Sequence, residues 1–183
     1  MSPILGIYAS QMSGHLFEPA GGYDALWSTT LSASTSSITI SNIPQTYRHL
    51  QVRTFIKGSS NDQDVWVNFN GDTASNYSEH RIYGNGASIV SGGLAPSSKI
   101  EYFGRSGSGT SVFGPSIVDI LDYGNTNKYK TIRSLTGWDN NGSGFIMFTS
   151  GSWRSTDAIT SMLIQPQGGT FSQYSSIALY GIK

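Results

Sequence analysis

The stretch that decides the fold is residues 47–58, YRHLQVRTFIKG. Successive side chains of a β-strand point to opposite faces, so strict alternation of apolar and polar residues predicts a strand with one buried face. One face carries Leu50, Val52, Thr54 and Ile56, and the other carries His49, Gln51, Arg53 and Phe55. Residues 47–58 are therefore expected to form a half-buried β-strand.

Similar runs recur along the chain and are separated by turn residues such as Asn-Gly and Pro. They cover residues 23–32, 36–44, 64–72, 76–86, 98–104, 115–125, 128–138, 144–153, 157–165 and 175–182. The turn at 139–144, DNNGSG, is typical of a hairpin connection. Residues 115–125 are apolar on both faces, which predicts a central strand. No convincing amphipathic helix interrupts these runs, so the sequence predicts an all-β protein, an antiparallel β-sandwich of the jelly-roll-like class.

The composition agrees with this class and excludes several functions. Charged residues make up 12% of the 183 residues, and 11 basic and 11 acidic residues cancel. This balance provides no basic surface for nucleic acid, and no apolar run approaches the ~20 residues that span a bilayer. The chain has no cysteine, which excludes disulfides and thiol chemistry. A surface with few charges and no net charge is typical of a protein inside an assembly.

Residues 1–22 differ from the rest and are expected to form an extended N-terminal docking arm, followed by a β-sandwich domain over residues 23–183. The arm begins with an apolar run that contains Ile4, Leu5, Ile7 and Tyr8, and it ends at Gly21-Gly22. The first basic residue is Arg48, so the run lacks the positive region of a signal peptide. Docking onto a partner through these four side chains is favoured over a first strand of the sandwich.

The clearest candidate binding site is residues 62–72, DQDVWVNFNGD. Strand alternation directs Val65, Val67 and Phe69 inward, which leaves polar groups around an indole on the outer face. That face carries Asp62, Asp64, Trp66, Asn68, Asn70 and Asp72. Aromatic, carboxylate and amide groups together suit a sugar, and the oxygens alone suit Ca²⁺. The simpler interpretation, a strand that faces solvent or another subunit, is favoured over both.

Nothing in the sequence predicts an enzyme. The three histidines, His15, His49 and His80, form no metal-ligand pair, and GxSxG and P-loop motifs are absent. The acids Asp119 and Asp122 suit structural bridging better than acid–base catalysis. We therefore assign no catalytic residue, metal ligand or cofactor from the sequence.

Four segments together resemble small β-rich proteins of tailed bacteriophages, cyanophages and environmental phages among them. They are SITISNIPQTYRHLQVR (37–53), VNFNGDTASNYSEH (67–80), VDILDYGNTNKYKTIRSLTGWDNNGSG (118–144) and YSSIALYGIK (174–183). The resemblance covers most of residues 35–183, and ILGIYAS (4–10) is similar to the apolar leader of several such proteins. It implies a virion structural component and supplies no catalytic residues.

The leading expectation is therefore a tail appendage subunit of the fibre or adaptor type, a homotrimer anchored to other virion proteins by its arm. A capsid cement or decoration protein is the alternative within the same class. A carbohydrate-binding module that recognises a host surface glycan is the alternative from another class. A glycan-cleaving enzyme is least favoured, because the chain lacks the repeats of a long β-helix.

Overall fold

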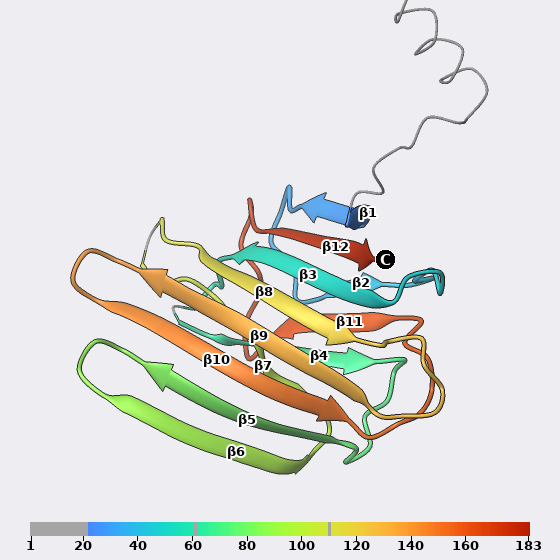
Figure 1. Cartoon of the computed structure of the whole chain (residues 1–183). Coiled ribbons are helices and arrows are strands. Elements are labelled where there is room, and N and C mark those ends of the chain that lie inside the picture. Colours follow the sequence, from blue (N-terminus) through green and yellow to red (C-terminus); the bar gives the residue numbers. More distant parts are fainter. Residues whose placement is uncertain (1–21, 61, 110) are drawn as a thin grey trace, which may run out of the picture.

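A computed structural model describes residues 22–60, 62–109 and 111–183, and over these residues the chain is built from antiparallel strands in two layers (Figure 1). The predicted arm, with Ile4, Leu5, Ile7 and Tyr8, lies outside the described residues apart from Gly22. The strands are β1 (Tyr23–Thr30), β2 (Ile38–Ile40), β3 (His49–Ile56), β4 (Asp64–Phe69), β5 (Tyr77–Gly84), β6 (Ile89–Ser97), β7 (Ile100–Arg105), β8 (Gly114–Leu121), β9 (Lys130–Asp139), β10 (Gly144–Trp153), β11 (Met162–Pro166) and β12 (Ser176–Ile182).

The strands form an eight-stranded sheet and a four-stranded sheet. The large sheet has the order β1-β12-β3-β8-β9-β10-β5-β6, and the small sheet has the order β2-β11-β4-β7. Neighbouring strands within both sheets pair antiparallel. The predicted class, an antiparallel β-sandwich of the jelly-roll-like type, is confirmed.

The core lies between the two sheets and follows the predicted alternation. On β3, Leu50, Val52 and Ile56 are fully buried, while Arg53 and Phe55 are exposed on the opposite face. At one end of the core, Phe69 of β4 packs against the rings of Tyr77 and Trp153 at centroid distances of 6.3 and 5.7 Å. Because aromatic side chains bury large areas, this cluster ties the small sheet to β5 and β10 of the large one.

One strand of the large sheet differs from the sequence prediction. The edge strand β6 was not predicted, since its sequence contains Gly92, Gly93 and Pro96, which are typical of a loop. An edge strand tolerates such residues because one side of its backbone needs no sheet partner. The prediction that residues 115–125 form a central strand is confirmed, because β8 lies between β3 and β9. Val118 and Ile120 are buried, but Ile117 is 46% exposed on the outer face.

Candidate functional site

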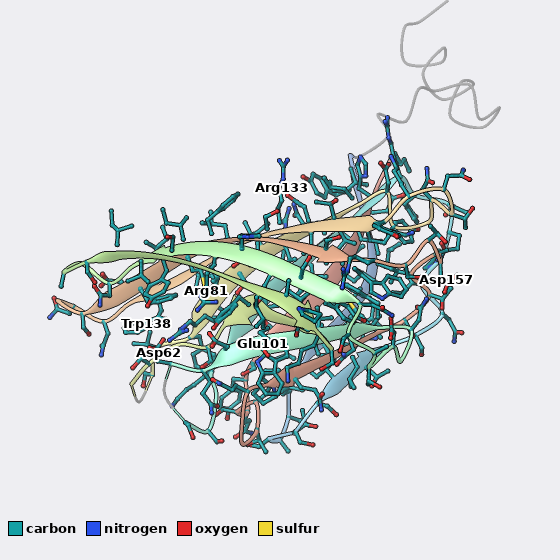
Figure 2. All side chains as sticks on the ribbon, turned by 90° about the horizontal axis from the view of Figure 1, so that it is seen from below. Asp62, Arg81, Glu101, Arg133, Trp138 and Asp157 are labelled. Carbon is teal, nitrogen blue, oxygen red and sulfur yellow. The ribbon has the colours of Figure 1, made fainter. Side chains whose placement is uncertain are left out.

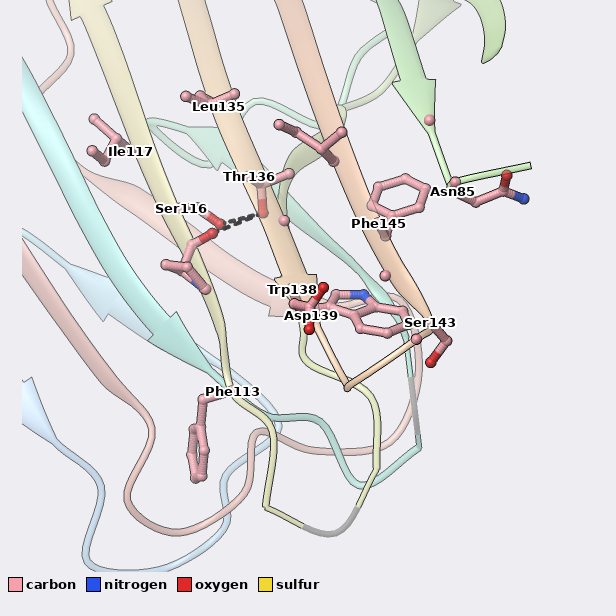
Figure 3. Close-up of a pocket in the computed structure, with 17 residues that line it drawn as sticks. Asn85, Phe113, Ser116, Ile117, Leu135, Thr136, Trp138, Asp139, Ser143 and Phe145 are labelled. Atoms are coloured by element: carbon pink, nitrogen blue, oxygen red, sulfur yellow. Dashed lines mark hydrogen bonds between the residues drawn. The ribbon is translucent and has the colours of Figure 1, made fainter. Parts of the chain in front are cut away.

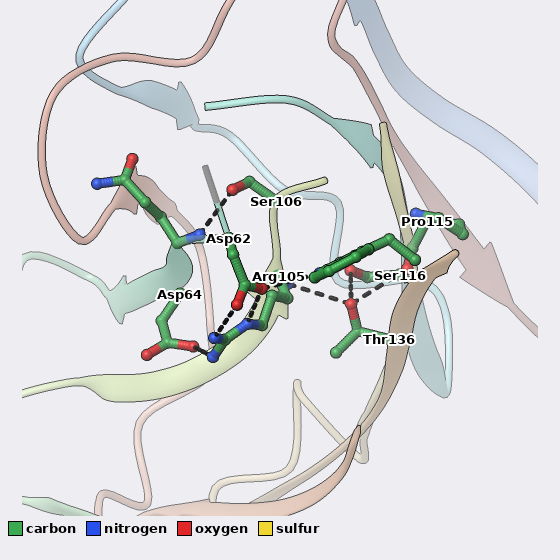
Figure 4. A network of polar contacts seen from close by, with 9 residues as sticks. Asp62, Asp64, Arg105, Ser106, Pro115, Ser116 and Thr136 are labelled. Carbon is green, nitrogen blue, oxygen red and sulfur yellow. Dashed lines mark hydrogen bonds and ion pairs between the residues drawn. The ribbon is translucent and has the colours of Figure 1, made fainter. Parts of the chain in front are cut away.

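Two of the predicted site residues, Asp62 and Asp64, bind one arginine of the small sheet (Figure 4). Arg105 of β7 donates from Nε and Nη2 to the two oxygens of Asp62 at 2.7 and 2.9 Å, and from Nη1 to Asp64 at 2.5 Å. The indole Nε1 of Trp138 donates to Asp62 at 2.8 Å. The guanidinium also lies 4.1 Å from the ring centroid of Phe145. The arginine therefore holds the loop before β4 against β7 and β10.

The two carboxylates share this arginine unequally. Burial would raise the pKa of Asp62, but hydrogen bonds and charge attraction from Arg105, together with the Trp138 hydrogen bond, hold that pKa below its usual value. Burial raises the pKa of Asp64 despite the same arginine. The carboxylates raise the pKa of Arg105 against the effect of its burial, so the guanidinium stays charged. This arrangement has the character of a structural clamp, because its charges are already neutralised within the chain.

Trp66 and Asn68, the next two predicted site residues, are covered by the segment around β7. The ammonium of Lys99 lies 3.4 Å from the ring centroid of Trp66, a cation–π contact on the face that a sugar would need. Asn68 donates from its amide to the backbone oxygens of Ser98, at 2.6 Å, and Asp72, at 3.2 Å. These contacts position the chain between β4 and β7.

The last two predicted residues, Asn70 and Asp72, lie in the turn after β4. The Asn70 amide donates to the Ala158 carbonyl, and its oxygen accepts from the backbone N–H groups of Thr160 and Ser161. Asp72 accepts from Trp153 Nε1 at 2.7 Å and from the Asn76 amide at 3.0 Å. Both residues line a polar depression of about 500 Å³, beside the exposed Tyr129 and Asp157.

The predicted alternation of β4 is confirmed, but the predicted solvent-facing polar side is wrong for two of its residues. Val65, Val67 and Phe69 point into the core, whereas Asp64 and Asn68 on the opposite side are only 8% exposed. The reason is tertiary: Arg105 and the Lys99 segment lie over that side. Ligand binding by the six residues stays a prediction. Within the described ranges, no group of three or more His, Cys, Asp or Glu side chains is arranged to hold a metal ion.

A different candidate site lies on the outer face of the large sheet, where a row of apolar side chains crosses four neighbouring strands. Ile117 of β8 is opposite Leu135 of β9, Leu135 is opposite Phe148 of β10, and Phe148 is opposite Ile82 of β5. Their exposed fractions are 46, 48, 48 and 50%, respectively. A contiguous exposed apolar surface of this kind marks an interaction site in soluble proteins.

A second apolar row lies beside the first, and between its members the surface is hollow (Figure 3). It includes Phe55 and Ile146. Phe55 lies opposite Pro115, and its ring stacks on that of Phe113 with 5.3 Å between the ring centroids. Ile146 is 60% exposed and lies opposite Gly84 on one side and Gly137 on the other. Because the two glycines carry no side chain, the sheet surface is open on both sides of Ile146. The resulting depression, which we call the apolar groove, has a volume of about 800 Å³.

The apolar surface ends where the outer face becomes polar. Toward the other end of the same strands, Asp119 is opposite Arg133, Arg133 is opposite Ser150, and Ser150 is opposite His80. Arg133 projects from the outer side of the large sheet, and Asp62 and Trp138 lie on the other side (Figure 2). The outer face is thus divided along the strands into an apolar half with the groove and a polar half.

Sequence reasoning missed this surface, although a signal was present. In β8, β9 and β10 the apolar residues do not stop at the buried face, since Ile117, Leu135, Ile146 and Phe148 occupy the alternate positions. Apolar residues on both faces were noted only for residues 115–125, where they predict a central strand. A sandwich of two layers has only one buried face per sheet, so the second apolar face is left exposed.

No helix in the described part of the chain is long and apolar enough to span a membrane. Comparison with protein-family models finds no match, and comparison with curated proteins finds none either. Among solved structures, the galectin LEC-6 of Caenorhabditis elegans is similar with a TM-score of 0.35 and 12% identity, over 83% of this chain and 94% of that one. A candidate pore-forming toxin from Bacteroides vulgatus has a TM-score of 0.10 and 6% identity, over 81% of this chain and 61% of that one.

Proposed function

We propose that this chain is a structural subunit that assembles through the apolar half of the outer face of its large sheet. The observation that carries the proposal is the row Ile82, Phe148, Leu135 and Ile117, in which four neighbouring strands expose an apolar side chain at the same level. Antiparallel sheets with one solvated face normally place polar residues there. An apolar outer face is therefore expected to be covered by another protein surface.

The energetics of this face suit an assembly with repeated contacts. Covering the exposed half of one large apolar side chain contributes on the order of 1 kcal/mol. Association costs at least ~4 kcal/mol in translational and rotational freedom, so one such row gives weak pairing by itself. Several contacts acting together in a closed, symmetric oligomer make the assembly stable. The formal net charge of zero gives little electrostatic repulsion between copies.

The place of the subunit is proposed from the sequence resemblance. A virion structural protein, most favourably a tail appendage subunit in a homotrimer, combines an apolar arm with a sandwich that packs against copies or other virion proteins. A capsid cement protein is the alternative. Imaging particles that carry a labelled copy of the chain separates the two, because label at the tail supports the appendage and label on the head supports cement.

Glycan recognition remains the second candidate function, and one observation favours a place for it. The polar depression beside Asn70 and Asp72 has an exposed aromatic ring, Tyr129, next to the polar groups of Asn76 and Asp157. A glycan array with the wild type and Tyr129→Ala tests it. Glycan binding by the wild type that is lost in Tyr129→Ala supports a lectin site. If the wild type binds no glycan on the array, glycan recognition is contradicted.

The assembly proposal is tested by the mass of the particle in solution. Size-exclusion chromatography with light scattering is expected to give an oligomer for the wild type and a monomer for Leu135→Glu. Thr131→Glu, on the same face of β9 but in its polar half, is expected to remain oligomeric. A wild type that is monomeric at all concentrations, or a Leu135→Glu variant that assembles normally, contradicts the proposal.

A further inference from the structure

The apolar groove is a site with a defined chemistry and no occupant in the described chain. It is lined by apolar side chains, among them Phe113, Ile117, Leu135 and Ile146, and by backbone at Gly84 and Gly137. Among the described residues that line it, Asp139 at one end is the sole charged one. Exposed backbone on a groove floor allows an extended peptide to approach closely. The groove therefore suits an uncharged apolar segment in an extended conformation.

Resting on the assembly proposed above, we propose that the groove binds residues 3–9, PILGIYA, of a second copy of this chain. The segment has the composition that the groove requires. It is apolar throughout, and the first charged side chain of the chain is Glu18. Neither surface would bury an unpaired charge, which is the main penalty that excludes most segments of a soluble protein from such a groove.

The direction of β1 favours a second copy over the segment's own groove. Tyr23, the first residue of β1, is level with Ile182, and Ile182 is level with His49. The groove lies at the other end of the sheet, where Thr30 is level with Ser176 and Ser176 with Phe55. Since β1 runs toward the groove end, the chain before Tyr23 enters from the polar end and would have to reverse to reach its own groove.

The length of chain before β1 is sufficient to join two copies. Residues 9–22 amount to 14 residues, which extend to at most about 46 Å at ~3.3 Å per residue. The strand spacing of ~4.8 Å and the rise of ~3.3 Å per residue place the groove roughly 28 Å from Tyr23 across one sheet. The segment can therefore reach its own groove or that of a neighbouring sheet packed at contact distance, and the direction of β1 is what favours the neighbour.

The absence of cysteine allows a direct test with single-cysteine variants of the full-length chain. Ser10→Cys places a thiol next to the apolar segment, and Ser143→Cys places one at the rim of the groove. Ser150→Cys is the matched control, because Ser150 is also an exposed serine but lies in the polar half of the outer face. Each substitution is close to isosteric and leaves the apolar residues unchanged.

Under mild oxidation, a mixture of the Ser10→Cys and Ser143→Cys chains is expected to give several-fold more mixed disulfide than the Ser10→Cys and Ser150→Cys mixture. Adding Ile7→Asp to the Ser10→Cys chain is expected to abolish the difference. Equal yields with both partners overturn the proposal. The proposal is also overturned if a double variant with Ser10→Cys and Ser143→Cys in one chain forms an internal disulfide while the mixture of single variants forms none. In that case the chain's own segment would fill the groove.

Failure of this inference is distinguishable from failure of the proposed function. If the wild type assembles and Leu135→Glu does not, but the cysteine mixtures show no preference, the outer face mediates assembly and the groove has another occupant. If Leu135→Glu assembles as the wild type does, the proposed function itself is wrong.

Discussion

Leu135 on β9 lies directly opposite Phe148 on β10, and nearly half of each side chain is exposed on the outer face of the large sheet. On the same strand, Ile132 points to the other face and is buried in the core. One strand thus carries apolar residues for two different purposes. The inner residue stabilises the fold, and the outer residue is available to a partner.

Substitutions on the two faces of β9 should separate stability from association. Ile132→Ala is expected to lower the free energy of unfolding by about 2–5 kcal/mol, because it leaves a cavity in the core. Leu135→Ala is expected to lower it by less than about 1 kcal/mol while weakening the oligomer. Urea denaturation monitored by fluorescence, with chromatography of the same samples, measures both effects. Similar losses of stability would show that the outer face is covered within a single copy.

Arg105 is expected to be a sensitive charged position. Arg105→Met removes the partner of both Asp62 and Asp64 and leaves two largely covered carboxylates without a counter-charge. Loss of one side of a fully buried pair costs about 3–5 kcal/mol. Because the Asp62 side chain is 35% exposed and partly screened by solvent, we expect a loss near or below the lower end of that range, and calorimetry should show a lower melting temperature.

Arg105→Lys is the control for geometry. A single ammonium cannot reproduce the bidentate contact with Asp62 together with the bond to Asp64, so we expect an intermediate loss. A melting temperature for Arg105→Met equal to that of the wild type would show that the clamp is not needed for the fold.

Glu79 on β5 should make stability depend on pH. Its Oε2 accepts from the backbone N–H groups of Glu101 and Tyr102 at 2.9 and 3.2 Å, while Oε1 has no hydrogen-bond partner among the described residues. Burial raises the pKa of Glu79 to about 7, opposed by those two N–H groups. The folded state therefore binds a proton that the unfolded chain releases at lower pH.

The sign follows from that difference in pKa. The stabilising contribution of Glu79 is complete below its ordinary value of 4.5 and is lost as the pH rises through about 7. The loss is on the order of 3 kcal/mol. Chemical denaturation between pH 4.5 and 8 measures it, and Glu79→Gln is expected to flatten the dependence. An equally steep profile in Glu79→Gln would assign the effect to another group.

Two glycines in the groove should respond differently to the same substitution. A Cβ on Gly137 would lie 2.6 Å from the Phe145 backbone oxygen, whereas a Cβ on Gly84 would lie 3.7 Å from the nearest atom, the Ser88 oxygen. Gly137→Ala is expected to destabilise the chain by about 1–3 kcal/mol, and Gly84→Ala to change stability by less than about 0.5 kcal/mol. Thermal unfolding of both variants compares them; equal shifts would show that the β9–β10 backbone relaxes freely.

Much of the fold was predictable because the alternation of apolar and polar residues in a strand shows which of its faces is buried. The alternation in residues 47–58 corresponds to β3, and the turn DNNGSG joins β9 to β10 as predicted. The edge strand β6 was missed because an edge permits glycine and proline. Alternation places Ile117 on the face opposite the core but does not say whether that face is covered. The face is exposed because the sandwich has only two layers.

The candidate site was predictable only in part. The sequence placed Asp62, Asp64, Trp66 and Asn68 on one side of a strand, and this is correct for Asp64, Trp66 and Asn68 on β4. It could not show that Arg105 and Lys99, more than 30 positions further along the chain, lie over that side. A polar pattern looks the same whether its hydrogen bonds go to a ligand or to the chain itself.

The sequence by itself determined the all-β class, the inward residues of most strands and the uncharged character of the N-terminal segment. Only the tertiary structure decided that Asp62 and Asp64 bind the same arginine. It also decided which exposed apolar residues form a continuous row, namely Ile82, Phe148, Leu135 and Ile117. The physical reason is that alternation assigns a residue to a face of its own strand. Strand order and register decide which residues are neighbours on that face, and the second sheet decides which face is covered.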